Sequence, residues 1–252
     1  IDELTLKLGR KRTRGLAHQI IARRAAMELQ DGDVVNLGIG VPEMIPNAAA
    51  DMGLNKQFTL TVEAGPIGGV PSSGVCFGAA INPEVLHDMA YQFDFYDGGG
   101  LDVAFLGALQ VDREGNVNVS RTEDNLIGIG GFIDITQTAK KVIYCFPFSG
   151  GGVKYELKDG ALSLIQEGKY TKFCEHVFEI SSSAAIARRE KKTVLYITER
   201  CVFQLDETTL SIIEIAPGID LQKDVLDQLP FQVHVSENLK EMDASLFRGL
   251  QN

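Results

Sequence analysis

The chain has few cysteines, few basic residues and no long apolar run among its 252 residues. Its four cysteines are widely spaced and form no C-x-x-C pair, which argues against a metal site, because metal ligands usually come in close pairs. They lie among apolar neighbours, so we expect buried thiols in a reducing, cytoplasmic compartment. No window reaches the ~20 apolar residues of a membrane span, and no secretory signal opens the chain, so we expect no membrane partner.

Basic residues are outnumbered, with 24 Lys and Arg against 34 Asp and Glu and a net charge of −10. An acidic chain lacks the positive surface that binds nucleic acid, so we expect no nucleic-acid partner. The basic cluster at residues 10–14 is short and is predicted to be a solvated run. The sequence contains no linker or repeat, which predicts one domain over residues 1–252. The chain starts at Ile1 rather than Met, so we expect a processed product or part of a longer protein.

Apolar strands alternate with helical segments along the chain. Helical spacing predicts a helix over residues 15–29, a second helix opened by Pro42 over 43–52, and a short helix over 224–229. Strands are predicted at 34–37, 58–62, 103–106, 142–146 and 193–197, with a hairpin at 202–205 and 210–215. This alternation predicts an α/β fold with a mostly parallel sheet flanked by helices on both faces.

Glycine is the most informative residue type, because its 26 copies are clustered, several directly after predicted strands. Ligands of open α/β sheets bind outside the carboxyl ends of the strands, and glycine lets a backbone amide approach a ligand closely. For any single cluster, an ordinary tight turn is an equal alternative. A dinucleotide fingerprint lacks its third glycine, and no Walker motif occurs, so neither nucleotide site is favoured. The clusters are residues 38–40, 65–69, 98–100, 128–131 and 150–152.

Glu63 ends the strand at 58–62 and is followed at once by Ala-Gly-Pro-Ile-Gly-Gly. A carboxylate here projects into a loop where backbone amides can converge, and carboxylates can act as covalent nucleophiles. From the residues alone, an exposed glutamate at a strand end is the commoner alternative. The four histidines are scattered and no G-x-S-x-G elbow is present, so a Ser-His-Asp hydrolase is unsupported.

Two motifs around Glu63 resemble those of family I coenzyme A transferases. They are Asn36-Leu37-Gly38-Ile39-Gly40-x-Pro42 and Glu63-Ala64-Gly65-x-x-Gly68-Gly69. Later segments at 98–102, 106–112, 115–118 and 128–134 continue the resemblance in the family's order. These motifs most resemble the β-type half of short-chain acyl-CoA (acetate/acetoacetate) transferases. In those enzymes an α-type half and a β-type half are fused in one chain. The resemblance implies the open α/β fold that these enzymes share with sugar-phosphate isomerases.

The same resemblance implies that Glu63 is the catalytic nucleophile, which forms an acyl-glutamyl anhydride and then a glutamyl-CoA thioester. It implies that the chain is the C-terminal half of a longer enzyme, with coenzyme A as substrate and covalent intermediate, short-chain carboxylates as acceptors and no metal. The implied partners are an α-type half, from the same precursor or a separate subunit, and further copies in a homo-oligomer. Two alternatives remain open, a non-catalytic ligand sensor and a CoA-thioester hydrolase. The implied oxyanion donors are Ile39, Gly40, Gly130 and Gly131, and the implied substrate or CoA contacts are Gly38, Gly65, Gly98, Gly99, Gly100 and Asn116.

Overall fold

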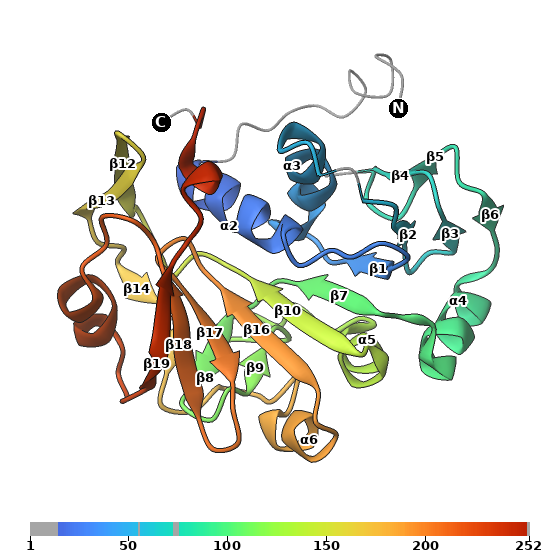
Figure 1. Ribbon diagram of the computed structural model, residues 1–252. Coiled ribbons are helices and arrows are strands. Elements are labelled where there is room, and N and C mark those ends of the chain that lie inside the picture. Colours follow the sequence, from blue (N-terminus) through green and yellow to red (C-terminus); the bar gives the residue numbers. More distant parts are fainter. Residues whose placement is uncertain (1–14, 55, 73–75, 251–252) are drawn as a thin grey trace.

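The computed structural model describes residues 15–54, 56–72 and 76–250, so the basic cluster at 10–14 lies outside the described residues. Its main element is a ten-stranded sheet with the order β19-β18-β17-β16-β10-β7-β1-β2-β3-β6 (Figure 1). The five strands from β2 to β16 are parallel, so their carboxyl ends share one edge of the sheet. They are β2 (Thr59–Thr61), β1 (Val34–Leu37), β7 (Val103–Leu106), β10 (Lys141–Cys145) and β16 (Thr193–Ile197).

Antiparallel pairing extends this parallel centre on both sides. One side carries the predicted hairpin, β17 (Cys201–Leu205) and β18 (Leu210–Ile215), with β19 (His234–Glu241) running parallel to β18. The other side carries β3 (Pro66–Ile67), which turns back directly after β2, and β6 (Val85–Leu86). The predicted mostly parallel sheet is therefore confirmed, with antiparallel margins.

Helices lie on both faces of the sheet, as predicted. In Figure 1, α2 (Leu16–Ala26) and α3 (Ile45–Asp51) lie above the sheet, whereas α5 (Phe132–Thr138) and α6 (Ala184–Arg189) lie below it. The helix α4 (Met89–Phe95) continues into the π-turn η3 (Tyr96–Gly100) just before β7. No helix among the described residues is long and apolar enough to cross a membrane.

Two predicted helices differ from the structure in detail. The segment after Pro42 starts as a 3-10 turn, η1 (Pro42–Met44), before α3 begins. The segment predicted over 224–229 is no α-helix but a π-turn, η4 (Leu221–Val225), followed by a 3-10 turn, η5 (Leu226–Gln228). The following Pro230 limits this second segment, because the residue before a proline avoids the helical region.

Short elements complete the described part of the chain. They are β4 (Val70–Pro71), β5 (Ala80–Ile81), β8 (Gln110–Asp112), β9 (Val117–Asn118), β11 (Ser149–Gly150), β12 (Lys154–Lys158), β13 (Ala161–Gln166), β14 (Tyr170–Thr171), β15 (Phe173–Cys174) and the 3-10 turn η6 (Ala244–Phe247).

The core lies on both faces of the central strands. All four residues of β7 are buried, which explains why these strands are continuous apolar runs rather than alternating ones. Cys145 and Cys201 are buried as predicted, and Cys174 is half-buried. The prediction is wrong for Cys76, which is exposed because it lies in the loop between β4 and β5 rather than in a strand.

Candidate active site

Glu63 lies at the carboxyl edge of the sheet, two residues after β2. The register of β1 and β2 places Asn36 opposite Thr61, so the glycine loop that follows β1 runs beside Glu63. The chain can turn back sharply after Glu63 because Gly65 has a φ of +119°, and a Cβ at this position would collide with the carbonyl oxygen of His87. Gly65 therefore has a structural role in aiming Glu63 out of the strand.

The Glu63 carboxylate contacts the loop that precedes α5. A Cβ at Gly131 would lie 3.0 Å from Glu63 Oε2 and 2.6 Å from Cε1 of Phe93. Only glycine leaves room at position 131 for both the carboxylate and the aromatic ring. The structure therefore brings together Glu63 and Gly131, which the family resemblance assigned to one site, and adds Phe93 from α4.

The environment of Glu63 disfavours its charge. The side chain is half-buried, and no described residue donates a hydrogen bond to its carboxylate. Burial raises the pKa of Glu63, and the nearby carboxylate of Asp134, in the first turn of α5, raises it further. A carboxylate that is ionised but poorly stabilised is a better nucleophile than a solvated one.

A buried polar network supports the end of β2 beneath Glu63. The Tyr96 hydroxyl donates a hydrogen bond to Thr61 Oγ1 at 2.9 Å and accepts one from Asn36 Nδ2 at 3.2 Å. Thr61 Oγ1 in turn donates to the carbonyl oxygen of Val35 at 2.9 Å. Burial raises the pKa of Tyr96, so the hydroxyl stays protonated and fixes η3 against both strands. Sequence reasoning missed this network, although a polar residue inside each of two apolar strands was a usable signal.

Four backbone amides were expected to form the oxyanion hole. Among the described residues, the amides of Ile39, Gly130 and Gly131 have no hydrogen-bond partner, and Ile39 is 68% exposed. The amide of Gly40 differs, because it donates to Glu43 Oε1 at 2.9 Å. Glu43 lies in the first turn after the loop. Its carboxylate reaches back three residues to the backbone amide of Gly40, as in a capping box. Gly40 therefore presents no free amide, whereas Ile39, the other residue that the resemblance offered in this loop, does.

The expected CoA contacts at Gly98, Gly99 and Gly100 are not brought to Glu63. These glycines lie in η3, immediately before β7 begins. The next residues pair with the amino ends of the neighbouring strands, since the Asp102 amide donates to the Val34 carbonyl at 3.0 Å. The glycine run is thus at the edge of the sheet opposite to that of Glu63.

Asn116 and Gly38 also have structural roles. The amide group of Asn116 is buried, donates to Asp112 Oδ2 at 3.0 Å, and accepts from the Ala184 amide at 2.9 Å at the start of α6. The Gly38 amide donates to the Phe105 carbonyl at 2.8 Å, and a Cβ at this position would lie 3.1 Å from Leu106 Cδ2. Asn116 therefore offers no free group to a substrate in this structure, whereas Gly38 shapes the loop beside Glu63.

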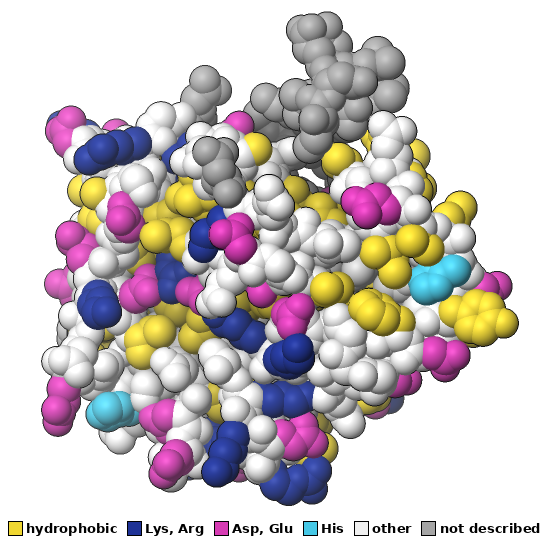
Figure 2. Space-filling view, turned by 45° about the vertical axis from the view of Figure 1, so that its right-hand side comes forward, with side chains coloured by type: hydrophobic (Ala, Val, Ile, Leu, Met, Phe, Trp, Pro, Cys, Tyr) yellow, Lys and Arg dark blue, Asp and Glu magenta, His cyan; other side chains and the backbone are white. Residues whose placement is uncertain are grey.

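Apolar side chains gather on the surface around β6 and α4. Figure 2 shows this side of the molecule, with hydrophobic side chains on the right. Leu86 is 72% exposed, and Met89 and Tyr91 are also exposed. Several exposed apolar side chains therefore lie near each other on this side of the molecule.

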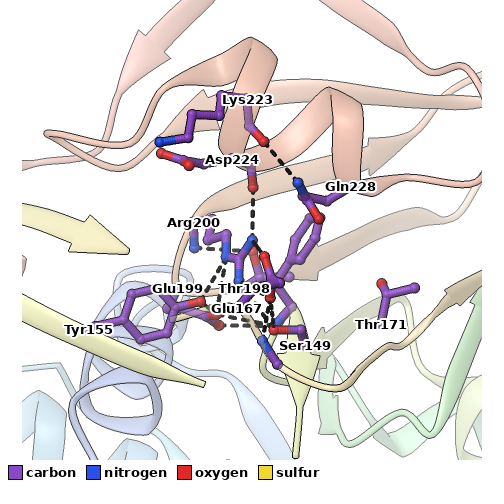
Figure 3. Close-up of polar contacts among 12 residues, drawn as sticks. Ser149, Tyr155, Glu167, Thr171, Thr198, Glu199, Arg200, Lys223, Asp224 and Gln228 are labelled. Carbon is purple, nitrogen blue, oxygen red and sulfur yellow. Dashed lines mark hydrogen bonds and ion pairs between the residues drawn. The ribbon is translucent and has the colours of Figure 1, made fainter. Parts of the chain in front are cut away.

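A second polar cluster lies at the carboxyl ends of β10 and β16 (Figure 3). Arg200 is fully buried and donates to both carboxylate oxygens of Glu167 at 2.7 Å and to the carbonyl oxygen of Asp224 at 2.8 Å. It also donates to the Tyr155 hydroxyl at 2.7 Å. These contacts tie the β12–β13 hairpin and η4 to the sheet, which indicates a structural role. Among the described residues, no group of three His, Cys, Asp or Glu could hold a metal ion.

The sequence pattern of the family described as "Coenzyme A transferase" matches residues 18–146, a segment that contains Glu63 and both glycine loops beside it. The chain belongs to the coenzyme A transferase family. It is 31% identical over 252 residues to the acetate CoA-transferase subunit beta of Haemophilus influenzae, covering 93% of this chain and 99% of that one. The chain therefore corresponds to the β-type part of a family I transferase.

The chain is also similar to the acetate CoA-transferase YdiF of Escherichia coli K12. The two are 48% identical over 229 residues, which cover 91% of this chain but 43% of YdiF. The chain thus spans less than half the length of that relative. The crystal structure of YdiF apoenzyme from E. coli O157:H7 superposes with a TM-score of 0.87 at 46% identity, covering 93% of this chain and 44% of that one. The same acyl-CoA transferase has also been solved as a thioester complex with CoA.

Proposed function

We propose that this chain is the β-type half of a short-chain acyl-CoA:carboxylate CoA-transferase of the acetate/acetoacetate type, working through a glutamyl-CoA thioester on Glu63. The observation that carries the proposal is the Glu63 carboxylate itself. It is half-buried at the carboxyl edge of the sheet, receives no hydrogen bond from a described residue, and lies against Gly131. The names of the two acetate CoA-transferase relatives support the reaction class.

In the first stage, a Glu63 oxygen attacks the carbonyl carbon of an acyl-CoA thioester. The carbon–sulfur bond breaks, CoA leaves as the thiolate, and an acyl-glutamyl anhydride remains. The thiolate then attacks the glutamyl carbon of the anhydride and expels the acyl group as a carboxylate, which carries away one oxygen of Glu63. The product of this stage is the glutamyl-CoA thioester.

In the second stage, an acceptor carboxylate attacks the glutamyl carbon and expels the CoA thiolate, which forms a new anhydride. The thiolate attacks the acyl carbon of this anhydride, so the new acyl-CoA forms and the Glu63 carboxylate is restored. These reaction steps need no oxidant, reductant or metal ion, and coenzyme A is the only coenzyme that takes part.

Each step passes through a tetrahedral oxyanion that needs backbone donors. The amides of Gly130 and Gly131 are the best placed for this, because they have no partner among the described residues and Gly131 adjoins Glu63. Ile39, in the glycine loop after β1, offers a third amide with no hydrogen-bond partner among the described residues. Removing one such donor typically costs about 10²–10³-fold in rate.

The proposal extends to the partners. Residues 1–252 would form one β-type domain, the C-terminal half of an α+β enzyme, and an α-type half would complete the site and supply further walls for acyl-CoA and short-chain carboxylates. Such α+β units would assemble into a homo-oligomer. The free cysteines among the described residues fit a cytoplasmic location.

The test uses the chain together with its α-type half. Acetoacetyl-CoA or propionyl-CoA is added without an acceptor, the thioester is reduced with borohydride, and mass spectrometry locates the modified residue. We expect modification at Glu63 and inactivation of the enzyme. Glu63→Ala should lose CoA transfer by about 10⁴-fold or more, as expected when a nucleophile is removed.

Two outcomes would contradict the proposal. Full transfer activity in a folded Glu63→Ala variant excludes Glu63 as the nucleophile. Net hydrolysis of the acyl-CoA in the presence of acetate, with no acetyl-CoA formed, shows that the protein is a thioester hydrolase instead.

A further inference from the structure

The Phe93 ring and the Glu63 carboxylate meet at one point. Phe93 lies on α4 and is half-buried, and its Cε1 atom lies 2.6 Å from the position that a Cβ on Gly131 would take. Glu63 Oε2 lies 3.0 Å from the same position. The edge of the ring and the carboxylate oxygen therefore border the same space beside Gly131, where a Cβ would otherwise stand.

The ring is held in this place by the network beneath Glu63. Phe93 packs edge-on against Tyr96, with ring centroids 5.6 Å apart and an interplanar angle of 78°. Tyr96 is itself fixed by its hydrogen bond to Thr61 at the end of β2. Aromatic pairs in this geometry are stabilising, so the ring is a fixed wall rather than a mobile side chain.

Apolar side chains continue outward from the ring. Met89 precedes Phe93 by one helical turn, so both lie on one face of α4, and Met89 is 53% exposed. On α5, Ile133 lies two residues beyond Gly131 and is exposed. Exposed apolar side chains thus lie on both elements that border Glu63, α4 and α5.

We propose that Phe93 forms a wall of the acyl-group subsite and restricts that subsite to compact, uncharged acyl groups. The inference rests on the proposed function, because it concerns the acyl group that Glu63 would carry. In the anhydride, the acyl carbon is one covalent bond away from a Glu63 oxygen, so the first carbons of the acyl chain come into contact with the ring. Apolar carbons gain from this contact, whereas a charged end would lose its hydration there.

The test measures specificity with the α-type half present. The kcat/KM values for CoA transfer to acetate are compared for propionyl-CoA and for the bulkier benzoyl-CoA, in the wild type and in Phe93→Ala. We expect the ratio of benzoyl-CoA to propionyl-CoA to rise by about tenfold or more, as is typical when a hydrophobic pocket changes size. Phe95→Ala is the matched control, because Phe95 lies on the same helix but packs against Gly100, away from Glu63. Its ratio should stay within about twofold of the wild type.

A second pair of variants covers the case in which Phe93→Ala does not fold. Phe93→Leu keeps an apolar side chain of smaller size and should raise the benzoyl-to-propionyl ratio, whereas Phe93→Trp should lower it. Equal ratios in these two variants, or the same ratio in Phe93→Ala and Phe95→Ala, overturn the role of Phe93.

The pH profile separates a wall from a merely structural residue. Burial raises the pKa of Glu63, so removing the ring should admit water and move the acid limb of kcat/KM to lower pH. Asp134 on α5 and Tyr96 on η3 also face Glu63, and both remain in the variant. An unshifted acid limb together with an unchanged ratio counts against the inference. A wild type that forms no thioester on Glu63 with either acyl-CoA contradicts the proposed function instead.

Discussion

Glu63 and Glu199 are carboxylates at the same edge of one sheet, and they are held in opposite ways. Glu199 follows β16, is fully buried, and accepts hydrogen bonds from the Phe148 amide at 3.0 Å and from the Tyr155 hydroxyl. The Arg200 guanidinium lies 3.7 Å from it. Glu63 receives no hydrogen bond from a described residue, and the charge that acts on it is another carboxylate. Burial raises the pKa of both carboxyl groups, so the two differ in their hydrogen-bond partners and not in the direction of the pKa shift.

The polar groups around the two carboxylates also differ in how completely they are hydrogen-bonded. Around Arg200, every guanidinium nitrogen has a hydrogen-bond partner (Figure 3). Close to Glu63, the buried Asn36 Oδ1 and Gln92 Nε2 have no partner among the described residues. Unpaired buried polar groups reduce stability and concentrate at functional sites. The Arg200 guanidinium is thus fully paired, whereas two buried polar atoms near the end of β2 are left unpaired.

Removing Arg200 should give the largest loss of stability. Arg200→Met leaves the buried Glu199 without its cation and detaches the β12–β13 hairpin, so we expect the free energy of unfolding to fall by about 3–5 kcal/mol. Urea denaturation followed by circular dichroism measures this. Arg113→Met is the control, because Arg113 is exposed and lies 3.5 Å from Glu175 in a surface ion pair, which is worth less than about 1 kcal/mol. Similar losses in both variants would contradict the structural role of the Arg200 region.

Replacing Glu63 should raise the free energy of unfolding, in contrast to replacing Arg200. The pKa of Glu63 is raised by burial, so the folded state binds the proton more tightly than the unfolded state. The ionised carboxylate therefore lowers stability as pH rises through the folded pKa, and this penalty is absent below the unfolded value. Glu63→Gln should stabilise the protein by about 1 kcal/mol at neutral pH, in the range of other substitutions at strained functional sites.

The pH dependence of this gain is the sharper measurement. Thermal unfolding of Glu63→Gln and wild type is compared at about pH 7 and about pH 4, near the usual carboxyl range. We expect the gain to shrink at the lower pH. Glu156→Gln, an exposed position on β12, is the control and should change stability by less than about 0.5 kcal/mol at either pH. A variant less stable than the wild type at neutral pH would show that the surroundings stabilise the Glu63 carboxylate, which contradicts its raised pKa.

Local signals in the sequence were sufficient for the frame of the site. Runs of apolar and β-branched residues predicted all five central strands, because strands buried on both faces carry few polar residues. The position of Glu63 at the end of β2 followed directly from that pattern. The contact between Glu63 and Gly131 was implied by the family resemblance, not by the residues, since 67 residues of chain separate these two positions.

The parts that the sequence did not predict depend on contacts between distant elements. Phe93 and Tyr96 reach Glu63 from a helix whose own pattern gives no sign of it. The Gly40 amide donates to the Glu43 side chain, and the Asn116 side chain accepts from the first amide of α6. Hydrophobic periodicity does not encode such side-chain contacts. A cluster of glycines predicts a turn but not the edge of the sheet on which the turn lies.

Gly98 and Gly65 make the last comparison, because both belong to glycine clusters once assigned to substrate binding. A Cβ at Gly98 would meet no atom within 4 Å, whereas Gly65 has a φ of +119° and no room beside His87. Gly98→Ala should leave the free energy of unfolding within about 0.5 kcal/mol, and the KM for acyl-CoA within about twofold. Gly65→Ala should destabilise the fold by about 1–3 kcal/mol, since it forces a strained backbone. A tenfold higher KM in folded Gly98→Ala would place CoA at the amino edge of the sheet, and a Glu63 site confined to the carboxyl edge would then have to be abandoned.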